Sequence, residues 1–73
     1  MKTDKNERID PKLALQLKEA RDKKGLTQLE VAKLADVTET FYAMTERGES
    51  NPSLAKLNRV LEALDLKILI KKA

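Results

Sequence analysis

Residues 27–48, TQLEVAKLADVTETFYAMTERG, contain two short helical patterns separated by almost no chain. The outer parts are rich in good helix formers, whereas Asp36, Val37 and Thr38 interrupt them. Asp is among the few residues besides Gly that tolerate the left-handed backbone of a tight turn. We therefore expect two short helices, about 28–35 and 39–46, with a turn at Asp36.

Both expected helices have their own N-terminal cap. Thr27 and Glu30 fit a capping box, in which the hydroxyl caps the first turn while the carboxylate accepts from the Thr27 amide. Thr38 stands in the corresponding position before the second helix. Two short helices capped in this way form a helix-turn-helix, whose second helix can lie in the DNA major groove. Free amides at Thr27 and Gln28 are then expected to face a backbone phosphate.

The beginning of the chain predicts a polar tail followed by a helix. Residues 1–9 are polar and charged without periodicity, which indicates a loose tail. Asp10 can cap a helix, and Pro11 suits the first helical position. Gly25 is a natural stop, so the first helix is expected over about 11–24.

The end of the chain changes from a helical to an alternating pattern. A fourth helix is expected from near Pro52 to Asp65, because apolar residues recur there at helical spacing. Residues 66–73, LKILIKKA, begin with period-two alternation, which predicts a β-strand. A lone strand leaves its backbone unpaired, so the same strand of a second copy is the simplest partner; packing back on its own subunit is the alternative. The residues expected to mediate dimerisation are Leu66, Ile68, Leu69 and Ile70. The helix-turn-helix domain would then cover residues 10–65.

The residue types that the chain lacks exclude several classes of site. There is no Cys and no His among the 73 residues, so disulfides and thiolate or imidazole metal ligands are impossible. No catalytic constellation emerges, and we expect no enzyme activity, no cofactor and no metal. One Tyr, one Phe and no Trp argue against a stacking platform for single-stranded nucleic acid. No apolar run could span a bilayer or serve as a signal-peptide core, so we expect a cytoplasmic protein without a membrane partner.

The segment GLTQLEVAKLADVTETFYAMTERGESNPSL resembles the phage repressor and Cro-like helix-turn-helix proteins, often called the Xre family. The resemblance rests on the order and spacing of several short pieces: GLTQ, the Val31-Ala32 pair, ERG, NPSL, and VLEAL in the fourth helix. It implies an all-α fold of four to five short helices of the lambda-repressor type. It also implies a homodimer on double-stranded DNA, with the helix over 39–46 as the recognition helix.

The same resemblance suggests individual roles. Base contacts are expected from Glu39, Thr40 and Met44, and Phe41 could touch a thymine methyl. Phosphate contacts are expected from Thr27, Gln28, Thr38 and Arg47. Arg21 and Glu46 are expected to form a structural ion pair, although such an Arg can also reach a phosphate. Two plainer interpretations stay open: Thr27 and Gln28 as a cap and a surface residue, and Glu39 as an acid that stabilises a helix N-terminus.

Several positions depart from the family pattern. Asp36 replaces the usual turn Gly, and Thr45 replaces an aliphatic residue. Phe41 and Tyr42 are adjacent, so both cannot face the core, and Tyr42 is the expected core member. Residues 36–49 contain four acidic residues and one basic residue, which disfavours a polyanion.

The last part of the chain, LEALDLKILIKK, resembles antitoxins of the HipB and HigA type. The resemblance implies a regulator that represses its own operon and binds a toxin protein. Two functions therefore compete: a dimeric DNA-binding repressor on a palindrome, and a module whose main task is to bind a partner protein. The acidic recognition helix, Phe41, Leu29 and Leu34 favour the second, and the two leucines could form a partner patch.

Overall fold

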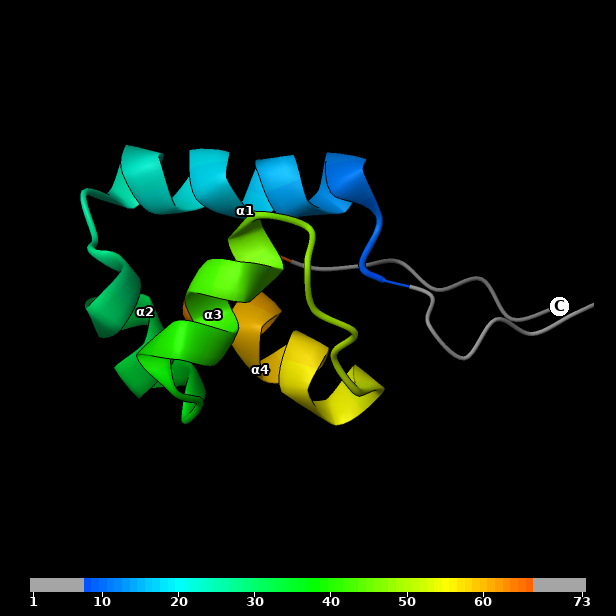
Figure 1. The fold of residues 1–73 in the computed structure, drawn as a ribbon. Coiled ribbons are helices and arrows are strands. Elements are labelled where there is room, and N and C mark those ends of the chain that lie inside the picture. The colour runs from blue at the N-terminus through cyan, green and yellow to red at the C-terminus, as the bar shows by residue number, and fades with distance from the viewer. Residues whose placement is uncertain (1–7, 67–73) are drawn as a thin grey trace, which may run out of the picture.

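The computed structural model describes residues 8–66 of the chain. This part contains four helices (Figure 1). They are α1 (Pro11–Lys24), α2 (Gln28–Ala35), α3 (Glu39–Glu46) and α4 (Leu54–Ala63). The expected all-α fold is confirmed, and the first three helices have the predicted bounds. The fourth begins at Leu54 and not at Pro52, because the Ser53 hydroxyl accepts from the Lys56 amide at 3.1 Å and caps the helix there. Ile68, Leu69 and Ile70 lie outside the described residues.

All four helices begin and end in the same way. Each starts at a polar N-cap whose side chain accepts a backbone amide: Asp10, Thr27, Thr38 and Ser53. Each is followed by a residue with a left-handed backbone: Gly25, Asp36, Gly48 and Asp65. The next amide then donates back to a carbonyl of the last turn, which is the Schellman motif. The local sequence therefore sets the length of every helix.

The C-terminal end of α4 corrects the expected start of the strand. The Leu66 amide donates to the Leu61 carbonyl at 2.8 Å, and the Leu66 side chain packs partly against the core of its own subunit. Leu66 thus belongs to the helix cap and is not a strand residue. A role of Leu66 in dimerisation remains a prediction.

The turn between α2 and α3 is supported from outside the motif. Asp36 has φ 60° and ψ 47°, the left-handed conformation expected for it. Arg59 of α4 donates from Nε to the Ala35 carbonyl at 2.9 Å and from Nη2 to the Asp36 carbonyl at 3.3 Å. A cation at a helix C-terminus also complements the helix dipole. Two hydrogen bonds from α4 therefore hold the turn at Asp36, which lacks the usual Gly.

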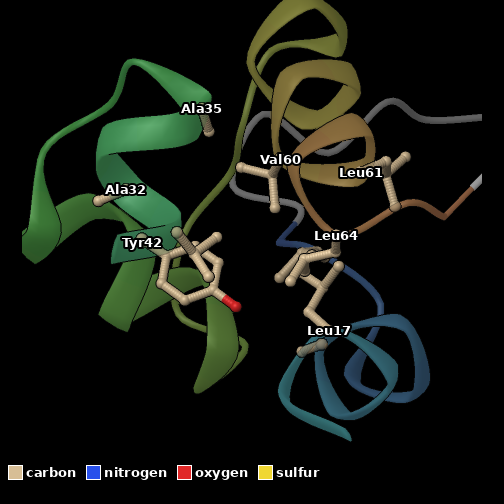
Figure 2. Close-up of a cluster of buried hydrophobic side chains, with 10 residues drawn as sticks. Leu17, Ala32, Ala35, Tyr42, Val60, Leu61 and Leu64 are labelled. Atoms are coloured by element: carbon tan, nitrogen blue, oxygen red, sulfur yellow. The ribbon is translucent and has the colours of Figure 1, made fainter. Parts of the chain in front are cut away.

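In the ribbon, α1 lies on one side of α2, α3 and α4 (Figure 1), and all four helices contribute side chains to the core. Figure 2 shows the Tyr42 ring among aliphatic side chains of this core. Tyr42 is fully buried, which confirms the expected choice between Phe41 and Tyr42. The buried hydrophobic residues are Ile9, Ala14, Leu17, Val31, Ala32, Ala35, Tyr42, Val60, Leu61 and Leu64.

Ile9 corrects the predicted extent of the tail. Its side chain is 7% exposed, and its amide donates to the Ser50 carbonyl at 2.9 Å. Ile9 precedes the cap Asp10, and it shares the buried cluster with Ala14 in the first turns of α1. This is the arrangement of a hydrophobic staple, which fixes the direction in which the chain enters a helix.

Thr45 replaces an aliphatic core residue, and its hydroxyl is fully paired. Thr45 and Ser50 are both buried, and their hydroxyl oxygens lie 2.7 Å apart. Thr45 also donates to the Phe41 carbonyl at 2.8 Å, so its single proton is used there and Ser50 supplies the proton between the two hydroxyls. Within the described residues, every buried side-chain nitrogen or oxygen has a partner.

This pairing predicts an asymmetric double-mutant cycle. Thr45→Val leaves the buried Ser50 hydroxyl without its acceptor and should lower the free energy of unfolding by about 1–3 kcal/mol. Ser50→Ala should cost less, because Thr45 keeps its bond to the Phe41 carbonyl. The double variant should be more stable than Thr45→Val alone, since both polar groups are then removed together. Urea denaturation of the four proteins measures this; simple additivity of the two single losses would contradict it.

Candidate nucleic-acid interface

One face of α3 is exposed and carries most of the predicted base contacts. Glu39 and Thr40 are exposed, and Met44 is half-buried. Thr40 and Met44 are four residues apart and so lie on the same side of the helix, roughly opposite the buried Tyr42 and Thr45. The burial of this second pair therefore fixes which side of α3 faces outward.

Phe41 lies at the flank of this face. Its side chain is half-buried, and the Lys56 ammonium of α4 lies 4.9 Å from the centre of its ring. One face of the ring is therefore covered by a cation. The predicted contact of Phe41 with a thymine methyl would have to use the remaining part of the ring.

The N-terminus of α2 offers only one of the two expected amides, that of Gln28 and not that of Thr27. The Thr27 hydroxyl accepts from the Glu30 amide at 3.1 Å, and the Thr27 amide donates to the Glu30 carboxylate at 2.7 Å. The capping box is thus formed, and it occupies the amide that was expected to be free for a phosphate. The amides of Gln28 and Leu29 come next, and within residues 8–66 they have no hydrogen-bond acceptor.

A buried carboxylate joins the three helices around this surface. Glu46, at the end of α3, accepts from Arg21 Nε at 2.6 Å and from Arg21 Nη2 at 3.1 Å. It also accepts from the side-chain Nε2 of Gln28 at 3.0 Å and from the Tyr42 hydroxyl. The Glu46 side chain is only 4% exposed and that of Arg21 14%. Arg21, Gln28, Tyr42 and Glu46, which we call the Glu46 network, therefore set the position of α1, α2 and α3 relative to one another.

The Glu46 network perturbs the titration of its members. Burial by itself would raise the pKa of Glu46, but the hydrogen bonds from Arg21, Tyr42 and Gln28 outweigh it, and the pKa lies below the usual range. Burial, followed by the hydrogen bond to Glu46, raises the pKa of Tyr42 well above its ordinary value. The hydrogen bond to Glu46 likewise raises the pKa of Arg21. All three shifts favour an ionised carboxylate beside a neutral phenol.

The remaining predicted phosphate contacts lie at the two ends of α3. The Thr38 hydroxyl accepts from the Phe41 amide at 3.0 Å and so serves as the N-cap. Arg47 is exposed and follows the last residue of α3, but its Nε lies 3.1 Å from the Glu49 carboxylate. Its charge is therefore partly compensated within its own loop.

Leu29 and Leu34 do not form one patch. Both are exposed, at 43% and 64%. Five residues turn an α-helix by about 140° beyond one full turn, so the two side chains leave α2 on different sides. The proposed single partner patch on α2 is therefore not supported by their placement.

The described part of the chain contains no sign of two other kinds of site. Among residues 8–66, no cluster of acidic side chains is arranged to hold a metal ion. No helix in this part is both long and apolar enough to cross a membrane.

The Glu46 network predicts a specific loss of stability. Glu46→Gln should lower the free energy of unfolding by about 2–4 kcal/mol. The largely buried Arg21 guanidinium then keeps only the exposed carboxylate of Asp22, at 3.8 Å, as a counter-charge. In the native protein this stabilisation should be complete above about pH 4.3, the ordinary Glu pKa, and should be lost as the pH falls through the lower pKa of the folded state. Urea denaturation at several pH values measures both effects. Glu19→Gln on the exposed side of α1 is the control, and an equal loss in both variants would contradict the assignment.

Tyr42 predicts an alkaline transition. Because its folded pKa is raised, the stabilisation is complete below about pH 10, the pKa of an exposed tyrosine, and is lost as the pH rises further. The chain has one Tyr and no Trp, so tyrosinate absorbance reports this group alone. Ionisation should coincide with loss of helical circular dichroism. Full ionisation of a protein that is still folded would show that the phenol is not held as described.

Comparison with known proteins places this arrangement in a family. The sequence profile of the helix-turn-helix family matches residues 17–70, more than half of the chain. YqaF of Bacillus subtilis (strain 168), described as an uncharacterized HTH-type transcriptional regulator, is 42% identical over 48 residues. These residues are 66% of this chain and 63% of YqaF, so the chain spans less than two thirds of the relative's length.

Two solved structures share the fold. The restriction-modification controller protein C.AhdI from Aeromonas hydrophila superposes with a TM-score of 0.73 and 34% identity, over 77% of this chain and 85% of the other. HipB in the HipA-HipB-O2-O3 complex superposes with a TM-score of 0.74 and 26% identity, over 88% and 92%. The matched profile spans α2, the Asp36 turn and α3 with their caps, and the chain therefore belongs to the Xre-like helix-turn-helix family that its sequence resembles.

Proposed function

We propose that this chain is a sequence-specific DNA-binding transcriptional regulator, a dimer that represses its own operon from a palindromic operator. The observation that carries the proposal is the outward face of α3, with exposed Glu39 and Thr40 at its start. The amides of Gln28 and Leu29 at the start of α2, which have no acceptor among residues 8–66, add to it. Family membership and the similarity to a transcriptional regulator support it. We assign the chain no catalytic activity and place its action in the cytoplasm.

In this proposal α3 lies in the major groove. Glu39 accepts a hydrogen bond from a cytosine N4 amino group, and the Thr40 hydroxyl can donate to or accept from a base edge. Met44 lies on the same side of the helix as Thr40, and it contributes apolar contact. The Glu46 network holds α3 against α1 and α2, so these side chains are presented on a rigid support.

The DNA backbone would be held at the edges of α3. The amides of Gln28 and Leu29 suit a phosphate at the start of α2, with the Thr27 hydroxyl nearby. Thr38 and Arg47 are the proposed contacts at the two ends of α3. Because Arg47 is paired with Glu49, a phosphate would have to compete with that carboxylate.

Dimerisation would set the spacing of the two recognition helices. A palindromic operator needs two copies whose α3 helices lie about one DNA turn, roughly 34 Å, apart. We propose that Leu66, Ile68, Leu69 and Ile70 mediate this pairing. We propose that repression is controlled by the concentration of the protein, by a partner protein or by proteolysis.

A second candidate function is the binding of a partner protein, as an antitoxin binds a toxin. It is favoured by the acidic surface of residues 36–49 and by the occurrence of the similar HipB chain in a complex with HipA. The two functions are compatible, since a repressor can also be a partner's inhibitor. Replacing surface residues of α3 separates them.

The DNA-binding proposal predicts a base-specific loss. Thr40→Ala should weaken binding to the operator by about 1–3 kcal/mol, because it removes a proposed base contact. Glu39→Gln should weaken it less, because the Gln carbonyl can still accept from the cytosine while the charge that strengthens the bond is lost. Binding to a scrambled DNA of equal length should change little in Thr40→Ala. A binding titration against the DNA upstream of the protein's own gene, with the mass of the protein measured alongside, tests this.

Glu62→Gln, on the exposed side of α4, removes the same charge away from α3 and is the matched control for Glu39→Gln. Equal binding of the native chain to both DNAs would overturn sequence-specific regulation. Partner binding that survives Thr40→Ala while operator binding is lost would assign both functions to separate surfaces.

A further inference from the structure

Lys56 and Phe41 form a contact that is explained neither by the family pattern nor by the proposed base contacts of α3. The Lys56 ammonium lies 4.9 Å from the centre of the Phe41 ring, within the range of a cation–π interaction. Phe41 belongs to α3, while Lys56 is in the first turn of α4, so the contact links the recognition helix to its neighbour. Both helices lie on the same side of α1 (Figure 1).

The charge around α3 makes this lysine important. The exposed charged groups of residues 36–49 are three carboxylates, Asp36, Glu39 and Glu49, against the single guanidinium of Arg47. Glu46 is buried with Arg21 and does not count toward the surface. Protein–DNA affinity is dominated by cations that contact phosphates, so a face with this balance needs positive charge from another element.

Lys56 can supply that charge. No carboxylate among residues 8–66 lies within ion-pair distance of its ammonium, whereas Lys18, Lys24 and Arg47 are each paired with an acidic side chain. Lys56 is exposed, and the Phe41 ring holds its ammonium at the flank of α3. An exposed cation–π contact is weaker than a charge-assisted hydrogen bond to a phosphate, so the ring can release the ammonium to DNA.

We propose that Lys56 contacts a DNA phosphate at the edge of the major groove and that Phe41 is its positioning residue. This inference rests on the proposed DNA binding. It changes the role of Phe41 from reading a thymine methyl to holding the cation beside α3. The contact would be independent of sequence, because a phosphate carries no base information.

The salt dependence of binding tests the proposal. Each phosphate contact contributes about 0.9 to the slope of log K against log salt concentration on duplex DNA. Lys56→Gln should therefore lower the magnitude of the slope by about 0.9 between about 50 and 200 mM salt. Lys56→Arg should retain the native slope, since an Arg can stack on the ring and bind phosphate.

Lys18→Gln is the matched control, because Lys18 lies on α1 and is paired with Asp22. It should leave the slope unchanged. Thermal unfolding of every variant is followed alongside, so that a loss of folding is not mistaken for a loss of contact. A native slope in Lys56→Gln would overturn the assignment of Lys56.

The role of Phe41 is tested by a double-mutant cycle. Phe41→Leu should weaken binding to the operator and to scrambled DNA by the same factor, while Lys56→Gln combined with Phe41→Leu should bind no more weakly than Lys56→Gln alone. Additive losses would show that Phe41 acts independently of Lys56, for example through a base or a partner protein, and would overturn the positioning role. If the native chain shows no DNA binding at any salt concentration, the proposed function itself fails.

Discussion

The carboxylate of Glu46 is the interaction on which the rest of this structure depends. It is nearly inaccessible to water, yet it remains ionised because Arg21, Gln28 and Tyr42 donate to it from three helices. A buried charge held in this way is strongly directional, unlike the aliphatic core around it. It therefore fixes the angle between α2 and α3, which a small hydrophobic core alone would define less sharply.

The Glu46 network also limits what the surface can do. Gln28 is a proposed phosphate contact, but its side-chain nitrogen already donates to Glu46. The capping box similarly uses the amide of Thr27. Groups that were expected to bind a phosphate are therefore already used within the fold at the start of α2. Among residues 8–66, the backbone amides of Gln28 and Leu29 remain available to an anion. This division lets one short segment serve as a helix cap and, in our proposal, also as a contact surface.

The excess of exposed carboxylates over residues 36–49 has a consequence for selectivity. A recognition surface rich in carboxylates gains little from the uniform attraction that draws basic proteins to any DNA. Its binding would depend more on correct base contacts and on cations brought from neighbouring elements, of which Lys56 is the nearest to the Phe41 ring. The same surface is also suited to a basic partner protein. Both proposed functions thus arise from one charge pattern.

Much of the fold follows from local signals in the chain. Each of the four helices begins at a polar N-cap and ends before a glycine or an aspartate with a left-handed backbone. Both signals depend only on the residue type at one position and on its nearest neighbours. The pairing of Arg21 with Glu46 is predicted by the family resemblance alone. The two residues are 25 positions apart in the chain, so no local pattern connects them. The burial of Ile9 was missed, because one isoleucine beside a polar tail has no periodicity to reveal it.

The sequence by itself determined the helices, their caps and the helix-turn-helix motif, because these depend on neighbours within four or five residues. Only the tertiary structure decided which of the polar groups remain available. The hydrogen bonds of Thr45 to Ser50, of Arg59 to the Asp36 turn and of Gln28 to Glu46 depend on how the chain packs, as does the position of Lys56 over Phe41. Contacts across the fold follow from the packing of whole helices, and no local pattern specifies which donor will meet which acceptor.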